Sequence, residues 1–251
     1  MKNPRDRFSN QSDYYKKYRP EYPVEFIDEI VSLVKNRGVA WDCGTGTGQV
    51  AKIISGSFKN VFATDISDNQ ISKAAEGSNI KYSVARAEES GFKDNTFDLI
   101  TVAQAAHWFD FDHFNNEAFR VSVNGGILAL WGYNLLRINN EVDSVIDYFY
   151  SDVLGDYWDR ERRHVEDSYA NIPFPFEKIQ LSKSYSIEKD FKLPELLGYF
   201  NSWSAVQNFR KATNTDPVSS LESKLYEVWG KSESNKTARF PIFYNIGRIK
   251  K

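Results

Sequence analysis

The chain has 251 residues, of which 41% are hydrophobic and 26% charged, and its formal net charge is −2. This length suits one large α/β domain, and the composition is that of an ordinary globular protein. Proteins that grip phosphate groups usually carry an excess of Lys and Arg, and no basic stripe is visible here. The charge therefore argues against a nucleic-acid or anionic-membrane partner.

The N-terminus and the single cysteine bear on the cellular compartment. Residues 1–12 are polar and lack the apolar centre of a secretory signal. No apolar run approaches the ~20 residues that cross a bilayer. Cys43 is the single cysteine of the sequence, so no internal disulfide can form, which fits a reducing compartment. We therefore expect a cytoplasmic protein.

The first half of the chain alternates helical patterns with short apolar segments. A helix is expected after Pro23, with Val24, Ile27, Ile30, Val31 and Val34 as its apolar stripe. Strands are then predicted at residues 39–41, 61–64, 80–84, 97–103 and 126–131, and helices at residues 49–57, 68–76 and 111–121. Nearly continuous apolar strands separated by helices are typical of a doubly wound parallel sheet, which binds ligands at the carboxyl ends of its strands.

The pattern changes after Tyr133. Residues 139–164 are helix-like and rich in Tyr, Trp and charge, residues 176–187 alternate like an antiparallel strand, and helices are expected at residues 193–209 and 217–229 before a last strand at 240–249. We therefore expect a single α/β domain with a mostly parallel, seven-stranded sheet and an antiparallel edge strand. Its parts are an N-terminal cap (1–23), a core (24–133), a helical insertion (134–175) and C-terminal strands and helices (176–251).

The segment at residues 39–48 runs from a strand into a glycine-rich loop. Gly44, Gly46 and Gly48 remove side chains that would keep a ligand from the backbone, and the amides of the following helix point toward such a ligand. Asp65, at the end of the next strand, can accept hydrogen bonds from the two hydroxyls of a ribose. Together these features predict a nucleoside-sized site.

Other ligand classes fit this loop less well. A dinucleotide loop has the pattern G-x-G-x-x-G, whereas the third glycine here comes one residue early. Asp42, ahead of the first glycine, is awkward beside a pyrophosphate and natural near an ammonium or sulfonium. The chain has no G-x-x-x-x-G-K-[ST] triphosphate loop. A tight turn without a ligand is the remaining alternative.

The acid followed by G-x-G-x-G resembles the first motif of the class I S-adenosylmethionine-dependent methyltransferases, in particular the small-molecule branch that includes trans-aconitate methyltransferase-like proteins. The resemblance covers residues 10–135 well and implies the Rossmann-like methyltransferase fold with S-adenosyl-L-methionine as cofactor. The cofactor contacts that it implies are Tyr18, Arg19, Asp42, Gly44, Thr45, Gly46, Gly48, Asp65, Ile66, Ala87, Glu88 and Gln104. No metal is expected.

Methyl transfer from a sulfonium needs little from the protein beyond holding nucleophile, methyl and sulfur in line. His107 is the candidate general base, and packing of the loop around Trp108 is its alternative role. The residues expected to contact the acceptor are Tyr14, His107, Trp108 and Trp203.

Two further groups of residues have both a functional and a structural interpretation. The N-terminal tyrosines with Arg19 can form a lid over the cofactor or belong to an ordinary terminus. Arg160, Arg162 and Arg163 can bind an acidic substrate or form a solvated helix face.

The sequence thus predicts methyl transfer from S-adenosylmethionine to a small molecule, with a carboxylate among the candidate acceptors. A cofactor-binding sensor or partner subunit without turnover is one alternative. A methyltransferase that acts on RNA or protein is the other. The oligomeric state is left open.

Overall fold

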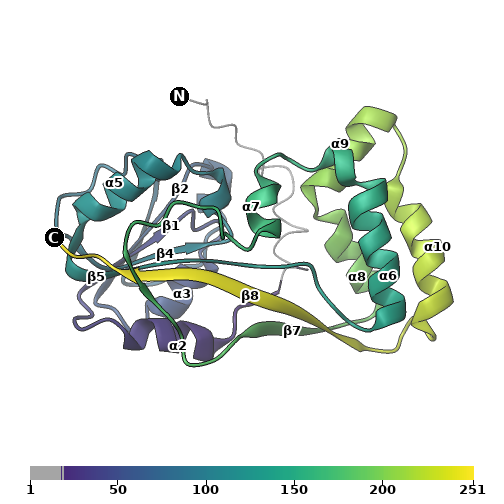
Figure 1. The fold of residues 1–251 in the computed structure, drawn as a ribbon, viewed down its shortest axis with the longest axis horizontal. Helices are drawn as coiled ribbons and strands as arrows, with labels where there is room; N and C mark the ends of the chain where they lie inside the picture. Colours follow the sequence, from purple (N-terminus) through teal and green to yellow (C-terminus); the bar gives the residue numbers. More distant parts are fainter. Residues whose placement is uncertain (1–17, 19) are drawn as a thin grey trace.

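A mixed sheet, mostly parallel, forms the centre of the molecule (Figure 1). The computed structural model describes residue 18 and residues 20–251, and within that part the sheet has eight strands in the order β3-β2-β1-β4-β5-β8-β6, with β7 also paired to β8. The parallel strands are β1 (Val39–Cys43), β2 (Asn60–Asp65), β3 (Ile80–Val84), β4 (Phe97–Ala103) and β5 (Ser122–Tyr133). Strand β8 (Lys236–Arg248) runs antiparallel to β5. The doubly wound sheet with an antiparallel edge is confirmed.

Helices cover both faces of this sheet because alternate strand residues point to opposite sides. Ile127, Ala129 and Trp131 of β5 pack with helices α2 (Val24–Ser32) and α3 (Gln49–Ile54). Leu128 and Leu130 face the other way, toward helix α5 (Phe111–Val121). The strands are therefore apolar on both faces, which is why they read as continuous apolar runs.

The first helix differs in one position from the predicted stripe. Val24 is 58% exposed, whereas Phe26 is completely buried and contacts the rings of Trp131 and Tyr185. The larger aromatic side chain removes more apolar surface from water than a valine would, so the helix turns Phe26 to the core.

A second group of helices lies at the end of β8 that is distant from the parallel strands (Figure 1). It consists of α6 (Asn140–Tyr148), α8 (Leu193–Asn201), α9 (Ser204–Thr213) and α10 (Pro217–Trp229). Between α6 and the sheet run a π-helical turn (Phe149–Val153), a 3₁₀ turn (Gly155–Tyr157) and the short helix α7 (Arg162–Glu166). The buried residues of α8 and α10 belong to the same apolar cluster as α2 and α3, so one core connects both groups.

Several predicted elements are shorter or divided in the structure. The strand expected at 176–187 is two strands, β6 (Glu177–Ile179) and β7 (Ser186–Phe191). They are separated because Glu29 binds the Ser182 amide and the Tyr185 hydroxyl, which bends the chain between them. Helix α4 (Asp68–Ile71) ends early because the chain turns back, so that the Ala75 amide donates to Thr47.

The helix expected at 193–209 is broken after Asn201. The Ser202 hydroxyl donates to the carbonyl of Tyr199, and Trp203 has an extended backbone before α9 begins. Because of this break, the Trp203 ring points into a group of aromatic side chains, whereas a continuous helix would direct the ring elsewhere.

Among the described residues, none of the helices has the length and apolar character that a bilayer crossing needs.

Candidate functional site

A cavity of about 310 Å³ lies at the carboxyl ends of β1, β2, β4 and β5 and extends to the second group of helices. Its first half is lined by residues that follow the strands, namely Asp42, Gly44, Thr45, Gly46, Asp65, Ile66, Gln70, Ala87, Glu88 and Gln104. Its second half is lined by His107, Trp108, Tyr133, Trp158, Asp159, Glu161, Arg162, Tyr199 and Trp203. This position is where a doubly wound sheet binds its ligand.

The glycines of the loop serve different purposes. A Cβ on Gly44 would lie 2.7 Å from the Cβ of Ala105, and one on Gly48 would lie 2.3 Å from the Tyr82 hydroxyl oxygen. Gly46 lines the cavity, and a Cβ there would meet nothing closer than the Gln70 side chain at 4.0 Å. Gly48 is not among the residues that line the cavity, and it permits a left-handed start of α3 beside Tyr82; its cofactor contact stays a prediction.

Asp65 is held by backbone amides on both of its carboxylate oxygens. Oδ2 accepts from the Gly46 amide at 2.9 Å, and Oδ1 accepts from the Ser67 amide at 2.9 Å. Each carboxylate oxygen can accept more than one hydrogen bond, so this fixation leaves capacity for a ligand. The carboxylate therefore links the glycine loop to the end of β2 and faces the cavity in a fixed direction.

Asp42 is buried beneath the loop. Its carboxylate accepts hydrogen bonds from the Thr45 and Thr101 hydroxyls and from the Ala51 amide. Burial raises the pKa of Asp42 to about 6, and these three hydrogen bonds act in the opposite direction. Asp42 thus ties the loop to α3 and β4 and places negative potential under the cavity.

The loop after β3 brings Ala87 and Glu88 to the cavity edge. Glu88 accepts from the Asp110 amide at 2.9 Å and lies 3.4 Å from the Arg86 guanidinium. Farther along, the Ser90 amide donates to Glu117 on α5 at 2.9 Å. Because both ends of this turn are attached to α5, the edge has a defined position beside the cavity.

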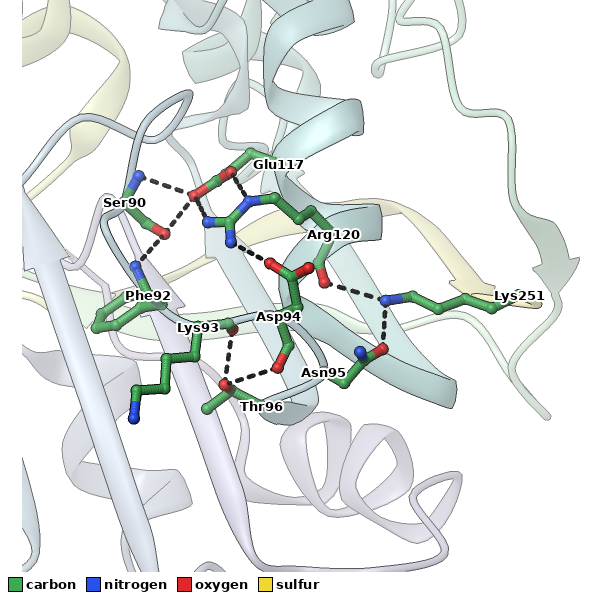
Figure 2. A network of polar contacts seen from close by, with 9 residues as sticks. All are labelled: Ser90, Phe92, Lys93, Asp94, Asn95, Thr96, Glu117, Arg120 and Lys251. Carbon is green, nitrogen blue, oxygen red and sulfur yellow. Dashed lines mark hydrogen bonds and ion pairs between the residues drawn. The ribbon is translucent and has the colours of Figure 1, made fainter.

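Figure 2 shows the network that holds this loop. Glu117 accepts from Ser90 and from Arg120, and Arg120 in turn binds Asp94 at 2.6 Å. The ammonium group of Lys251 binds the Arg120 carbonyl at 3.0 Å, so the C-terminal residue joins the same network. The hydrogen bonds from Arg120 and Ser90 outweigh burial and lower the pKa of Glu117. Glu117 is therefore a carboxylate at neutral pH.

Gln104 and His107 follow β4. Gln104 has a left-handed backbone (φ 53°), and its side-chain oxygen accepts from the Tyr133 amide at 3.1 Å. A non-glycine residue in this conformation is held by its surroundings and is frequently part of a functional site. It connects the ends of β4 and β5 where the two halves of the cavity meet.

His107 is buried, and its Nδ1 lies 3.1 Å from the hydroxyl of the fully buried Tyr169. Burial raises the pKa of Tyr169, so its hydroxyl keeps its proton at neutral pH. A protonated phenol can donate this proton to Nδ1. This arrangement favours the tautomer in which Nε2 of His107 carries the proton.

The second half of the cavity is built from aromatic side chains of separate segments. The Trp158 ring lies 5.3 Å from that of Trp203 and 4.7 Å from that of Tyr150, and Trp203 lies 5.8 Å from Tyr199. Arg162 lies over the Trp158 ring at 5.0 Å. This part of the cavity is therefore rich in aromatic rings that are inclined to one another, and the guanidinium of Arg162 lies over one of them.

The structure brings together most of the predicted site residues. Tyr14 and Arg19 lie outside the described residues. Tyr18 is not among the residues that line the cavity, and its ring packs against Gly198 of α8; its cofactor contact stays a prediction. Arg162 lines the cavity, whereas Arg160 and Arg163 are exposed and do not.

Sequence reasoning missed Gln70, Tyr133 and Trp158, which all line the cavity. Tyr133 ends the fifth parallel strand and could have been found from that position. Gln70 is buried, and its side-chain oxygen has no hydrogen-bond partner among the described residues. An unsatisfied buried acceptor in a cavity fits a polar ligand such as a nucleoside cofactor. No group of three potential metal ligands occurs in the described part of the chain.

The comparisons with known proteins agree with this geometry. The profile of a methyltransferase domain matches residues 41–130. A methyltransferase-like protein of Dictyostelium discoideum is 32% identical over 97% of this chain and 95% of its own length. The structure of a type II methyltransferase-like protein from Anaeromyxobacter dehalogenans has a TM-score of 0.86 and 36% identity, and the match covers 93% of this chain and 99% of that one.

A more distant structure shares the fold. Phosphoethanolamine N-methyltransferase 2 of Haemonchus contortus, in complex with phosphomonomethylethanolamine and S-adenosylhomocysteine, has a TM-score of 0.51 at 15% identity, over 98% of this chain and 60% of that one. None of these relatives selects the trans-aconitate-like branch, which stays a prediction. Similarity over nearly the whole length, together with the cavity at the glycine loop, shows that the chain belongs to the class I S-adenosylmethionine-dependent methyltransferases, with S-adenosylmethionine as its cofactor.

Proposed function

We propose that this enzyme transfers the methyl group to a small-molecule acceptor bound in the second half of the cavity. The observation that carries the proposal is the continuity of the cavity, because one cavity is lined by Asp65 and Glu88 as well as by Trp158 and Trp203. A donor and an acceptor bound in its two halves would be neighbours. An acceptor in this space has to be small, since about 310 Å³ is at the lower end of ligand-site volumes.

The two halves have different tasks in this proposal. S-adenosylmethionine, when bound, supplies the methyl group on a positively charged sulfur, which makes it an activated electrophile. Asp65, Gln70 and Glu88 hold and orient the cofactor in the first half of the cavity. The aromatic rings of the second half exclude water and align the acceptor for in-line displacement. Orientation of this kind is a large part of catalysis when the electrophile is already activated.

His107 is proposed to contact the acceptor, as a general base or as a hydrogen-bond donor. A base has to present a deprotonated Nε2 to the cavity, whereas the hydrogen bond with Tyr169 favours a protonated Nε2. The donor role suits a carboxylate acceptor, which is already ionised and needs no base. We therefore retain a carboxylate as a candidate acceptor. The cytoplasmic location stays a separate prediction.

Release of S-adenosylhomocysteine is the direct test. The protein is supplied with S-adenosylmethionine and with panels of small acids, phenols and amines, and product is quantified by mass spectrometry. Release that depends on one of these molecules supports the proposal. Release that requires RNA or protein instead would contradict it. Cofactor binding without turnover on any acceptor would favour the sensor interpretation.

A further inference from the structure

Arg162 has an unusual environment in the second half of the cavity. Its guanidinium lies over the rings of Trp158 and Tyr150, with distances to the ring centroids of 5.0 and 5.7 Å. Its Nε donates to the Tyr150 hydroxyl at 3.0 Å, and that hydroxyl donates to Glu166 at 2.6 Å. Trp158 is fixed as well, because its Nε1 donates to the Tyr150 carbonyl. The direction of the guanidinium is therefore set by its neighbours.

The terminal amino groups of Arg162 have no carboxylate to bind within the described residues. Its polar contact there is the Nε bond to Tyr150, which is a neutral phenol because burial raises its pKa to about 12. By contrast, Arg86, the other arginine among the described residues that line the cavity, is paired with Glu88 at 3.4 Å. Asp159 and Glu161 line the cavity near Arg162 and have interactions of their own.

A guanidinium that is stacked on an aromatic ring and held through Nε presents its outer edge to a ligand. That edge carries parallel N–H groups, which match the two oxygens of a carboxylate or the oxygens of a phosphate. Because the rings of Trp158 and Tyr150 limit its solvation, an ion pair there is stronger than at an open surface. The adjacent rings of Trp158 and Trp203 suit the planar or apolar remainder of the same molecule.

We propose that Arg162 anchors the acceptor through an oxyanion, so that the enzyme acts on small organic anions with a flat or apolar body. This inference rests on the proposed function, since it names the chemical class of the acceptor in the second half of the cavity. The proposal assigns this role to Arg162 alone, because the neighbouring Arg160 and Arg163 are exposed and do not line the cavity.

The test measures binding of benzoate and benzamide, which have the same shape and differ in charge, to protein saturated with S-adenosylhomocysteine. Binding is followed by calorimetry on the wild type, R162M and R160M. The two variants lose the same charge two residues apart, so R160M controls for general electrostatics. Phenyl phosphate is a third probe, which distinguishes a phosphate from a carboxylate as the preferred oxyanion.

In the wild type, benzoate or phenyl phosphate should bind at least about tenfold more tightly than benzamide. R162M should abolish that preference while S-adenosylhomocysteine affinity and the melting temperature stay unchanged, R162K should retain part of it, and R160M should retain all of it. Equal binding of benzoate and benzamide in the wild type would overturn the proposal. So would a preference that survives R162M, or failure of all three probes to bind. Failure of S-adenosylhomocysteine to bind would count against the proposed function instead.

Discussion

The two halves of the cavity are built in different ways. In the half that we propose for the cofactor (the cofactor half), backbone groups hold the site: amides of Gly46 and Ser67 fix Asp65, and strand ends set where the loops lie. In the half that we propose for the acceptor (the acceptor half), side chains hold side chains, as in the stack of Arg162 on Trp158 and of Trp158 beside Trp203. A site that is held by backbone groups tolerates substitution of the neighbouring side chains and keeps the same ligand. A site built from side chains can change its ligand by single substitutions.

The largest effect should come from the carboxylate that links the loop to β2. Asp65→Ala removes the acceptor of the Gly46 amide and the expected acceptor of the ribose hydroxyls, so cofactor affinity should fall by about 100-fold or more. Calorimetry with S-adenosylhomocysteine measures this. Asp68→Ala removes the same charge from an exposed residue of α4 and should leave affinity unchanged. Equal affinities for the two variants would refute the assigned contact.

Packing of the loop should respond next. Gly48→Ala combines a left-handed φ of 80° with a contact of 2.3 Å to the Tyr82 hydroxyl, so it should lower the free energy of unfolding by about 2 kcal/mol or more. Gly91→Ala has a similar φ of 72° with open space around it and should cost only about 1 kcal/mol. Urea denaturation of both separates the two contributions. A cost no greater for Gly48→Ala would show that Tyr82 moves aside easily.

The network in Figure 2 should have a smaller, pH-dependent effect. Glu117→Gln removes the ion pair with Arg120 and should cost about 1 kcal/mol of stability at pH 7. The folded pKa of Glu117 is depressed below 4.5, so its stabilisation is present above that pH and is lost as the pH falls through the folded pKa. The difference between wild type and variant should therefore shrink on acidification, as measured by thermal unfolding from pH 7 to 3. A difference independent of pH would contradict this account.

The smallest effect is expected in the acceptor half, at His107. Tyr169→Phe removes the hydroxyl at Nδ1, so His107 should change from a single tautomer with Nε2 protonated to a mixture of both. Long-range proton–nitrogen NMR spectra report the tautomer directly. His113, an exposed residue bound to Asp110, is the internal control and should not change. If Nδ1 carries the proton in the wild type, the general-base interpretation of His107 gains support.

The cofactor half was largely predictable because its information is local. The strand, the glycines and Asp42 lie within ten residues, and Asp65 follows at the end of the next strand, so adjacency of parallel strands brings them together. The reason for each glycine was only partly predictable. The spacing of the glycines indicated a ligand at each position, but the close Tyr82 side chain on β3 is sufficient to explain why residue 48 is a glycine.

The acceptor half was decided by tertiary structure. Trp158 and Trp203 lie far apart in sequence, as do His107 and Tyr169, and their contacts depend on where helices break rather than on periodicity. Arg160, Arg162 and Arg163 look alike in the sequence, yet among these three only Arg162 lines the cavity. The sequence by itself determined the sheet, the loop and the methyl donor, because hydrophobic periodicity and backbone geometry depend on residues that are close together in the sequence. Only packing between distant segments decided the acceptor pocket, because a side chain acquires its neighbours when the chain has folded.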